Sequence, residues 1–299
     1  MQQEYGCLNI TGTILSKQKI IEIVKNGYVR DWDDPCLFTL IMLRRCGFPP
    51  GAILAFVNQL GVTKAKTNVQ VVKLEQTVRQ YLETSVPHLM LVLKLLKVII
   101  DDLPDEYIKM VEVPYSKDPS FGSCEVPFTK MVYIEKLDFC EVDSPDYFCL
   151  VPSKTVGLMK APYPITATLY EKDPKTSEIT CVHAKYEKPV EGSPAKKVKI
   201  YIHWVGESPK HNSPKCAEVR VFNQLFKLED PSSHPDGFLA DINPESEQIF
   251  ANSFIETGFD EICRSAPWPK EKNKDSGEGE GEAKGKEAEH HTAVEPYSI

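Results

Sequence analysis

The sequence has no Cys-x-x-Cys pair, although it contains nine cysteines. They are scattered singly and their total is odd, whereas zinc sites and disulfide frameworks use closely spaced or even-numbered sets. This pattern argues against both kinds of site, so we expect no metal ligands and no disulfide. It also predicts a reducing compartment, most simply the cytosol.

The sequence also lacks any apolar run that approaches the roughly 18 residues needed to span a bilayer. The best candidate, HLMLVLKLLKVII at 88–100, is interrupted by Lys94 and Lys97 at helical spacing and predicts an amphipathic core helix. The start, MQQEYGCLNI, has no basic segment followed by a long apolar core. We therefore expect neither a secretory signal nor a membrane partner.

Positive charge is not in excess. Lys and Arg number 35 against 43 Asp and Glu, which gives a formal net charge of -8. Attraction to nucleic acid is thus excluded as a bulk property, and any such contact must be local. The 41% hydrophobic fraction is that of an ordinary globular protein, and 299 residues suffice for two or three compact units.

The first third of the chain is dominated by helical patterns. One-sided apolar stripes predict two short helices within 37–60, a third over 71–84 and a fourth that begins at Pro87 and continues to about Ile100. The stripes of the first two helices are formed by Leu37, Leu40, Ile41, Ile53, Leu54, Val57 and Leu60.

Beyond Leu103 the chain is rich in proline and in short β-prone runs. VKIYIHWV at 198–205 has the clearest alternation of apolar and polar residues. Several short strands separated by turns favour β-barrels over a parallel α/β sheet. After Trp268 the sequence is of low complexity and rich in glutamate and glycine, so we expect a disordered acidic tail at 268–299.

A phosphate contact is suggested near the start of the chain. Ser16, Lys17 and Lys19 precede an apolar helical run, and helix N-termini and lysines both attract anions. Such a Ser-Lys pair is a weak signal by itself. Two other candidates favour structural roles: Asp33 and Asp34 are expected to cap the following helix rather than to act in catalysis, and His203 is expected to be structural rather than a ligand.

Seven stretches together have a family pattern. They are EYGCLNI, ILSKQKI, DWDDPCLFTLIMLRRCGFPP, EVPFTKMVYIEKLDF, VKIYIHWV, EVRVFNQLF and GFLADINPES. In this order, from Glu4 to about Ser246, the chain resembles the C-terminal half of eukaryotic-type glutaminyl-tRNA synthetases, which are class I aminoacyl-tRNA synthetases. LFTL and IHWV resemble the glutaminyl rather than the glutamyl branch.

The resemblance implies an α+β fold: a helical subdomain follows the end of a Rossmann-type catalytic domain, and an antiparallel β-barrel anticodon-binding region comes next. The implied boundaries are 1–28 for the end of the catalytic domain with the Ser-Lys signature loop, 29–85 for the helical tRNA-contacting subdomain, 86–267 for an incomplete barrel region and 268–299 for the tail.

The same resemblance implies the activity and its participants. The reaction is that of a glutamine–tRNA ligase, with ATP and Mg²⁺ as cofactors, tRNA and glutamine as partners, no DNA and a monomeric, cytoplasmic protein. In the family the ATP pocket also needs a first signature motif, which contains histidine, and most of a Rossmann domain. Neither is in this sequence, so we expect the chain alone to be inactive and to retain neither cofactor.

Residue roles follow from the resemblance position by position. Lys17 is the implied catalytic residue, and the ATP-binding set is Cys7, Leu8, Leu15, Ser16 and Lys17. The implied tRNA-binding set is Thr63, Lys64, Ala65, Lys66, Thr67, Asn68, His88, Phe148, Cys149, Gly157 and Met159.

Several positions depart from the family, which has arginine there. They are Cys7, Gln18, Cys36, Cys46, His88, Cys149, Met159 and Gln224. Arginine becomes Cys, His or Gln by single C-to-T changes in CGN codons, a route that does not explain Met159. Arginine's planar fork cannot be replaced by these residues at phosphates or base edges. The alternative to a ligase is therefore a non-catalytic tRNA-binding remnant or a degenerate duplicate.

Overall fold

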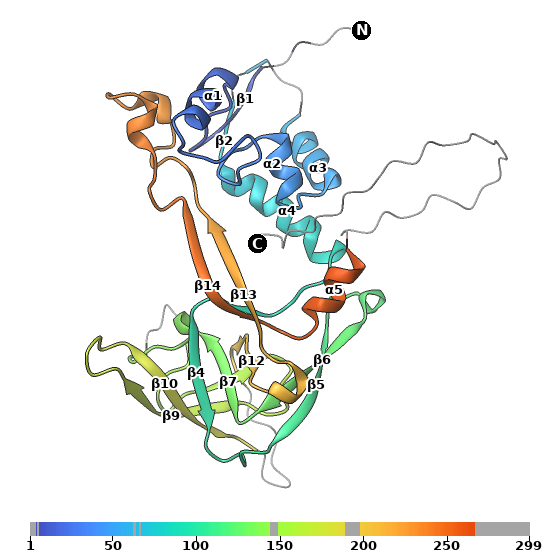
Figure 1. Cartoon of the computed structure of the whole chain (residues 1–299). Coiled ribbons are helices and arrows are strands. Elements are labelled where there is room, and N and C mark those ends of the chain that lie inside the picture. Colours follow the sequence, from blue (N-terminus) through green and yellow to red (C-terminus); the bar gives the residue numbers. More distant parts are fainter. Residues whose placement is uncertain are drawn as a thin grey trace, which may run out of the picture. The chain divides into compact units, whose positions relative to one another are not determined.

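The computed structural model describes residues 4, 6–61, 64–65, 67–143, 149–188 and 198–266 (Figure 1). The expected acidic tail at 268–299 lies outside these residues. Within them, no helix is both long and apolar enough to cross a bilayer. Helices and sheets coexist, which confirms the α+β expectation.

The helices and strands have the following bounds. The α-helices are α1 Lys17–Lys25, α2 Leu40–Arg45, α3 Pro50–Leu60, α4 Val71–Ser85 and α5 Phe259–Ser265. The strands are β1 Leu8–Ile10, β2 Thr67–Val69, β3 Leu91–Val92, β4 Leu95–Ile100, β5 Ile108–Pro114, β6 Ser123–Thr129, β7 Met131–Glu135, β8 Thr155–Leu158, β9 Ile165–Lys172, β10 Ile179–Tyr186, β11 Tyr201–Ile202, β12 Val205–Gly206, β13 Lys215–Phe222 and β14 Glu247–Ile255.

The chain divides into two compact units, and each unit is built from segments that are not consecutive in the sequence. The first comprises Met1–Ser85, Phe222–Glu247 and Ala266–Ile299, and the second comprises Val86–Val221 and Gln248–Ser265. The stretch assigned by resemblance to the barrel region, 86–267, is thus shared between the two.

The first unit is built on two apolar clusters. One contains Ala52, Phe56 and Leu74 from α3 and α4. The other joins Ile20 and Ile23 of α1 to Leu225 and Phe226, about two hundred residues later in the chain. Burial of these side chains, roughly 1.5–3 kcal/mol each, holds Phe222–Glu247, which we call the returning segment, against α1.

Local signals explain why the first unit's helices lie where they do. Pro50 occupies the first position of α3, where a missing N–H costs nothing, and Gly61 ends the helix with a φ of 69°. Thr39 begins α2, because its side-chain oxygen accepts the N–H of Met42 at 3.1 Å. Asp34 does not cap α2, contrary to expectation; it accepts the backbone N–H of Arg30 and that of Cys36 inside the preceding turn.

The second unit contains a curled, mostly antiparallel seven-stranded sheet in the order β11-β8-β9-β10-β4-β7-β12 (Figure 1). A β5-β6 hairpin and a three-stranded sheet, β13-β14-β3, accompany it. Trp204, Phe128 and Val98, each 0% exposed, lie in its continuous apolar core.

Two expectations for this unit are wrong. The helix predicted from Pro87 to Ile100 is instead β3 and β4, and in β4 each buried residue alternates with a half-buried one. VKIYIHWV is not one strand: only Tyr201–Ile202 and Val205–Gly206 pair, the first with β8 and the second with β7. His203 between them is exposed.

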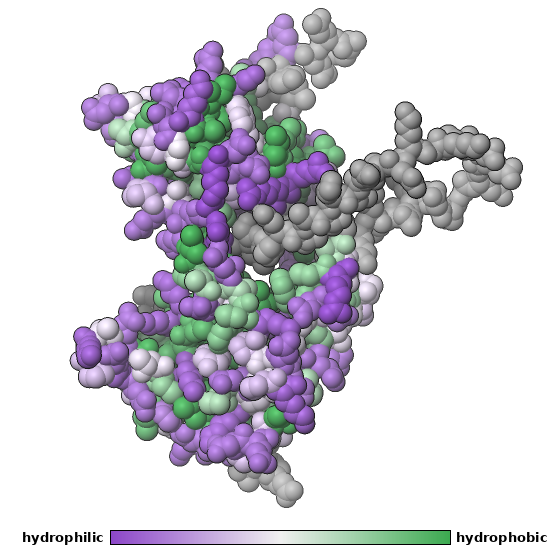
Figure 2. Space-filling model, in the orientation of Figure 1, coloured by the Kyte–Doolittle hydropathy of each residue, from purple (hydrophilic) through white to green (hydrophobic). Residues whose placement is uncertain are grey.

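The surface of both units is mixed. Figure 2 shows hydrophilic residues over most of the face in view, interrupted by hydrophobic patches. In the first unit Leu54 of α3 is 63% exposed and Leu40 of α2 is 75% exposed. The apolar stripe expected to be buried on these two helices is therefore partly turned outward.

Candidate nucleic-acid interface

The Ser-Lys pair lies at the start of α1 and faces solvent. Ser16 is the residue before the helix, its side chain makes no capping hydrogen bond, and its carbonyl accepts the N–H of Ile20 at 2.9 Å. Lys17 is exposed and makes no ion pair with another described residue. An ammonium group beside the helix N-terminus is thus available to an anion.

The second lysine of this loop is used differently. The Nζ of Lys19 donates a hydrogen bond to the hydroxyl of Ser232 at 2.7 Å and lies 5.1 Å from the centre of the Phe238 ring. Lys19 therefore fastens the returning segment to α1. Of the two lysines singled out in the sequence, Lys17 is the one that remains a candidate for a phosphate contact.

The structure brings together two groups of expected site residues. Strand β1 pairs with β2 in parallel, with Leu8 opposite Thr67 and Asn9 opposite Asn68. Cys7 and Leu8 from the implied ATP-binding set thus adjoin the implied tRNA-contacting segment. Lys64 in that segment pairs with Glu4 at 2.9 Å.

The structure describes only part of this expected tRNA-contacting segment. Ala65 lies beside Gly6, where an added Cβ would come within 2.7 Å of the Ala65 carbonyl oxygen. Thr63 and Lys66 lie outside the described residues, and only the backbone of Thr67 is described.

In the second unit Gly157 and Met159 lie on and just after β8. Gly157 is opposite Tyr201 in the parallel register with β11, and a Cβ at Gly157 would lie 2.4 Å from the Tyr201 ring. The ring therefore lies directly on the glycine backbone, while Tyr201 is 60% exposed. The carbonyl of Met159 accepts a hydrogen bond from Nε1 of Trp204 at 2.8 Å, which fixes the end of β8 to the core.

Cys149 has no free thiol. It forms a disulfide with Cys140, so the expectation of no disulfide is wrong at this pair. The cause is a backbone ladder: Leu150 donates to the carbonyl of Asp138 and accepts from the N–H of Cys140, which brings the two Cα atoms to 5.9 Å. The separation of nine residues between the two cysteines in the sequence does not by itself predict this pairing. Phe148, the neighbouring expected contact, lies outside the described residues.

His88 lies apart from these residues in the fold. It is exposed, and its backbone N–H donates to the carbonyl of Tyr115 just after β5. Gly157 lies on β8 of the seven-stranded sheet and Met159 lies just after that strand, whereas β5 pairs with β6 in a separate sheet. Two lysines lie near β8: Lys154 pairs with Asp143, whereas Lys160 makes no ion pair with another described residue and has a φ of 60°.

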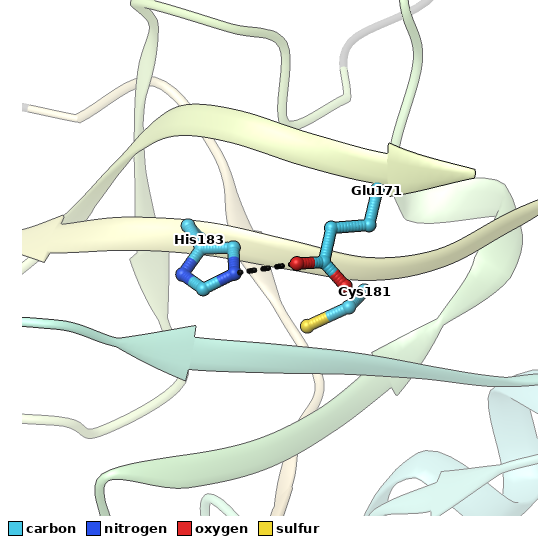
Figure 3. Close-up of side chains that lie close together, drawn as sticks. All are labelled: Glu171, Cys181 and His183. Carbon is cyan, nitrogen blue, oxygen red and sulfur yellow. Dashed lines mark ion pairs between the residues drawn. The ribbon is translucent and has the colours of Figure 1, made fainter.

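One cluster of ligand-type side chains was missed by sequence reasoning. Glu171 of β9 lies beside Cys181 and His183 of β10, with donor atoms within 4.8 Å of one another (Figure 3). Hydrogen bonding to Asp101 raises the pKa of His183, and burial raises the pKa of the Cys181 thiol. The only sequence signal is the Cys-x-His spacing within a strand.

Three family models match the chain. The class I (E and Q) tRNA synthetase catalytic-domain model matches residues 1–84, and two anticodon-binding-domain models of the same class match 86–187 and 201–263. The boundary between the first two matches coincides with the boundary between the two units at Ser85, whereas the third match includes Phe222–Glu247 of the first unit.

Curated relatives are similar over most of the chain. A glutamine–tRNA ligase of Saccharomyces cerevisiae is 51% identical, with 89% of this chain and 33% of that protein covered. A probable glutamine–tRNA ligase of Schizosaccharomyces pombe is 45% identical, with 90% and 33% covered. One from Bradyrhizobium diazoefficiens is 34% identical, with 91% and 48% covered. The chain thus spans about a third to a half of the length of these relatives.

Proposed function

Since the chain belongs to the class I tRNA synthetases of the E and Q type, we propose that it is the tRNA- and anticodon-binding half of a glutamine–tRNA ligase. The proposal is supported by relatives that are glutamine–tRNA ligases and by two anticodon-binding matches, over residues 86–187 and 201–263. Its partners are glutamine tRNA and, in the ligase reaction, glutamine and ATP. It acts in the cytosol as a monomer.

The observation that carries the proposal is the Tyr201 ring lying on Gly157. Unpaired bases are recognised by stacking on exposed aromatic faces, and a ring supported from behind loses little freedom when a base stacks on it. Gly157 belongs to the implied tRNA-binding set, and Lys160, two residues beyond β8, supplies a charge for the backbone phosphates. A local contact of this kind suits a chain whose net charge is -8.

The test is a binding measurement with glutamine tRNA. Tyr201→Ala should weaken binding by about 1–3 kcal/mol, the usual contribution of one base stacked on an aromatic ring. Tyr28→Ala is the matched control, because Tyr28 is a half-exposed tyrosine in the first unit, and it should leave binding unchanged. Equal binding by the Tyr201→Ala variant and the unchanged protein would contradict the proposal.

A second candidate is a tRNA-binding protein that does not discriminate the anticodon. Cys149, at a position where the family has arginine, is buried and bonded to Cys140, so it offers no donor to a base edge. The phosphate contacts would still give affinity, since they carry no sequence information. Dissociation constants for glutamine tRNA and an anticodon-swapped copy distinguish the two candidates: a preference of tenfold, about 1.4 kcal/mol, favours the ligase.

For the ligase reaction we assign one phosphate contact to this chain. The exposed ammonium of Lys17 beside the N-terminus of α1 suits the phosphates of ATP, and Leu15 and Ser16 flank it on the exposed surface. No described residue is assigned to Mg²⁺. Inactivity of this chain alone stays a prediction, tested by glutamine-dependent exchange between ATP and pyrophosphate.

A further inference from the structure

Three side chains with different donor atoms converge on the outer face of the seven-stranded sheet (Figure 3). Cys181 is opposite Glu171 in the β9-β10 register, and His183 follows two residues later on the same strand. Nε2 of His183 lies 3.5 Å from Oε1 of Glu171. Sulfur, nitrogen and oxygen thus face a common point from two neighbouring strands.

A second carboxylate orients the imidazole. Nδ1 of His183 lies 2.9 Å from Oδ1 of Asp101, and the Asp101 backbone N–H is held by the carbonyl of Ala184 at 3.0 Å. A carboxylate at Nδ1 keeps the proton on that nitrogen and leaves the lone pair of Nε2 toward Glu171. Histidine ligands of zinc are commonly oriented by a carboxylate in this way.

We propose that Glu171, Cys181 and His183 bind a divalent transition-metal ion, of which zinc fits best. Zinc accepts cysteine, histidine and carboxylate together at about 2.0–2.3 Å in tetrahedral geometry. Those bond lengths place a nitrogen and an oxygen ligand about 3.4 Å apart, close to the separation between His183 and Glu171. Three protein ligands leave the fourth position to water.

The charge balance supports a cation at this point. The Cys181 thiolate and the Glu171 carboxylate neutralise a divalent ion, and Asp101 adds a negative charge behind the histidine. Lys97 of β4, opposite Cys181 in register, is the cation that faces the cluster from the other neighbouring strand. Without a metal, a protonated His183 between two carboxylates satisfies the same geometry, so the imidazolium is the competing state.

The site would fasten β9 to β10 on the solvent side of the sheet. Cys181 is 7% exposed, whereas the Glu171 side chain is 61% exposed, so the ion would enter from the Glu171 side. The site shares no residue with the contacts assigned to tRNA, so loss of the metal should leave tRNA affinity unchanged.

The test is titration of the full chain, with its Cys140–Cys149 disulfide intact, with Co²⁺, followed by displacement with Zn²⁺. Cobalt bound to a thiolate gives a charge-transfer absorption band, and the Cys181→Ser variant assigns that band to Cys181. We expect one equivalent of this band, its loss in Cys181→Ser, and a fall in affinity of at least tenfold in Glu171→Gln. Cys216→Ser removes an exposed thiol of the same unit and should change nothing.

Asp101→Asn tests the orienting role, and we expect a ten- to hundredfold loss of affinity with the band retained. Glu171→Gln should fold normally, because the side chain of Glu171 is mostly exposed, and an unchanged far-UV circular dichroism spectrum verifies this. A loss of affinity in this variant is then not due to misfolding. Absence of the band in the unchanged chain would overturn the site, and so would a band that persists in Cys181→Ser.

Discussion

The carboxylate of Glu256 lies 3.9 Å from the thiol of Cys124, and both side chains are buried in the second unit. One carboxylate oxygen, Oε2, has no hydrogen-bond partner among the described residues. Burial raises the pKa of Glu256 to about 7, and hydrogen bonds from Cys124 and the Met90 backbone offset only part of that effect. A buried acid of this kind is neutral in mildly acidic solution and charged above neutrality.

The stability of the second unit should therefore fall as pH rises. The unfolded carboxyl loses its proton near pH 4.5, whereas the folded one keeps it until about pH 7. The free energy of unfolding should drop by about 3 kcal/mol between these values and then level off. Glu256→Gln should remove this decline in urea denaturation, and exposed Glu125→Gln should retain it. An identical pH profile for Glu256→Gln would contradict the argument.

Trp204→Phe should destabilise the second unit. The indole is fully buried, packs edge-on against Phe128 at 5.2 Å and donates to the carbonyl of Met159. Phenylalanine leaves that carbonyl unpaired, which costs about 1–3 kcal/mol. Urea unfolding followed by circular dichroism measures the loss. His203→Ala, next in sequence and exposed, is the control and should stay within about 0.5 kcal/mol of the parent.

The ion pair between Arg30 and Glu247 should contribute measurably but modestly to the first unit. Nη2 of Arg30 lies 2.7 Å from both carboxylate oxygens, although the arginine side chain is 47% exposed. Such partly exposed pairs contribute about 0.2–1 kcal/mol. A double-mutant cycle with Arg30→Ala and Glu247→Ala should give a coupling in this range that shrinks in high salt. No coupling at low salt would show that the pair is energetically silent.

Gly157→Ala should weaken tRNA binding through Tyr201. The new methyl group would meet the ring at 2.4 Å and push it off the β8 backbone. In a chain that already carries Tyr201→Ala, the same change should have almost no further effect, because the obstructed ring is gone. Additive losses in the double variant would mean that Gly157 acts on tRNA independently of the tyrosine.

Helices α3 and α4 could be predicted from the sequence, because their end signals are local. Pro50 and Gly61 bracket α3 within the chain itself. The direction in which each helix faces could not be predicted: Leu54 and Val57 form an apolar stripe yet are exposed, while Ala52 and Phe56 are buried. Which stripe is buried depends on partners such as α4 that the local pattern does not contain.

The run at 88–100 shows how one pattern supports two structures. Lys94 and Lys97 are three residues apart, which suits a helix face, but Leu96, Val98 and Ile100 are the residues that point into the core. A period of two therefore prevails over a period near three and a half, because β4 pairs with β7 and β10 on its two sides. Tertiary pairing overrides local preference here.

The candidate contacts divide in the same way. Lys17 could be identified from neighbouring residues, since a helix N-terminus is a local feature. Tyr201 on Gly157, the Cys140–Cys149 disulfide and the convergence of Glu171 with His183 depend on strand register, which relates residues far apart in the chain. Register is not encoded in any single stretch, so these sites emerged only from the fold.

The returning segment, Phe222–Glu247, has a consequence for how the protein is made. Ile20 and Ile23 are translated about two hundred residues before Leu225 and Phe226, which cover them, and the main part of the second unit is translated in between. Domains usually fold in order of synthesis. The apolar face of α1 therefore stays exposed while a later part of the nascent chain is made and folds. During that interval this face is a binding site for a chaperone.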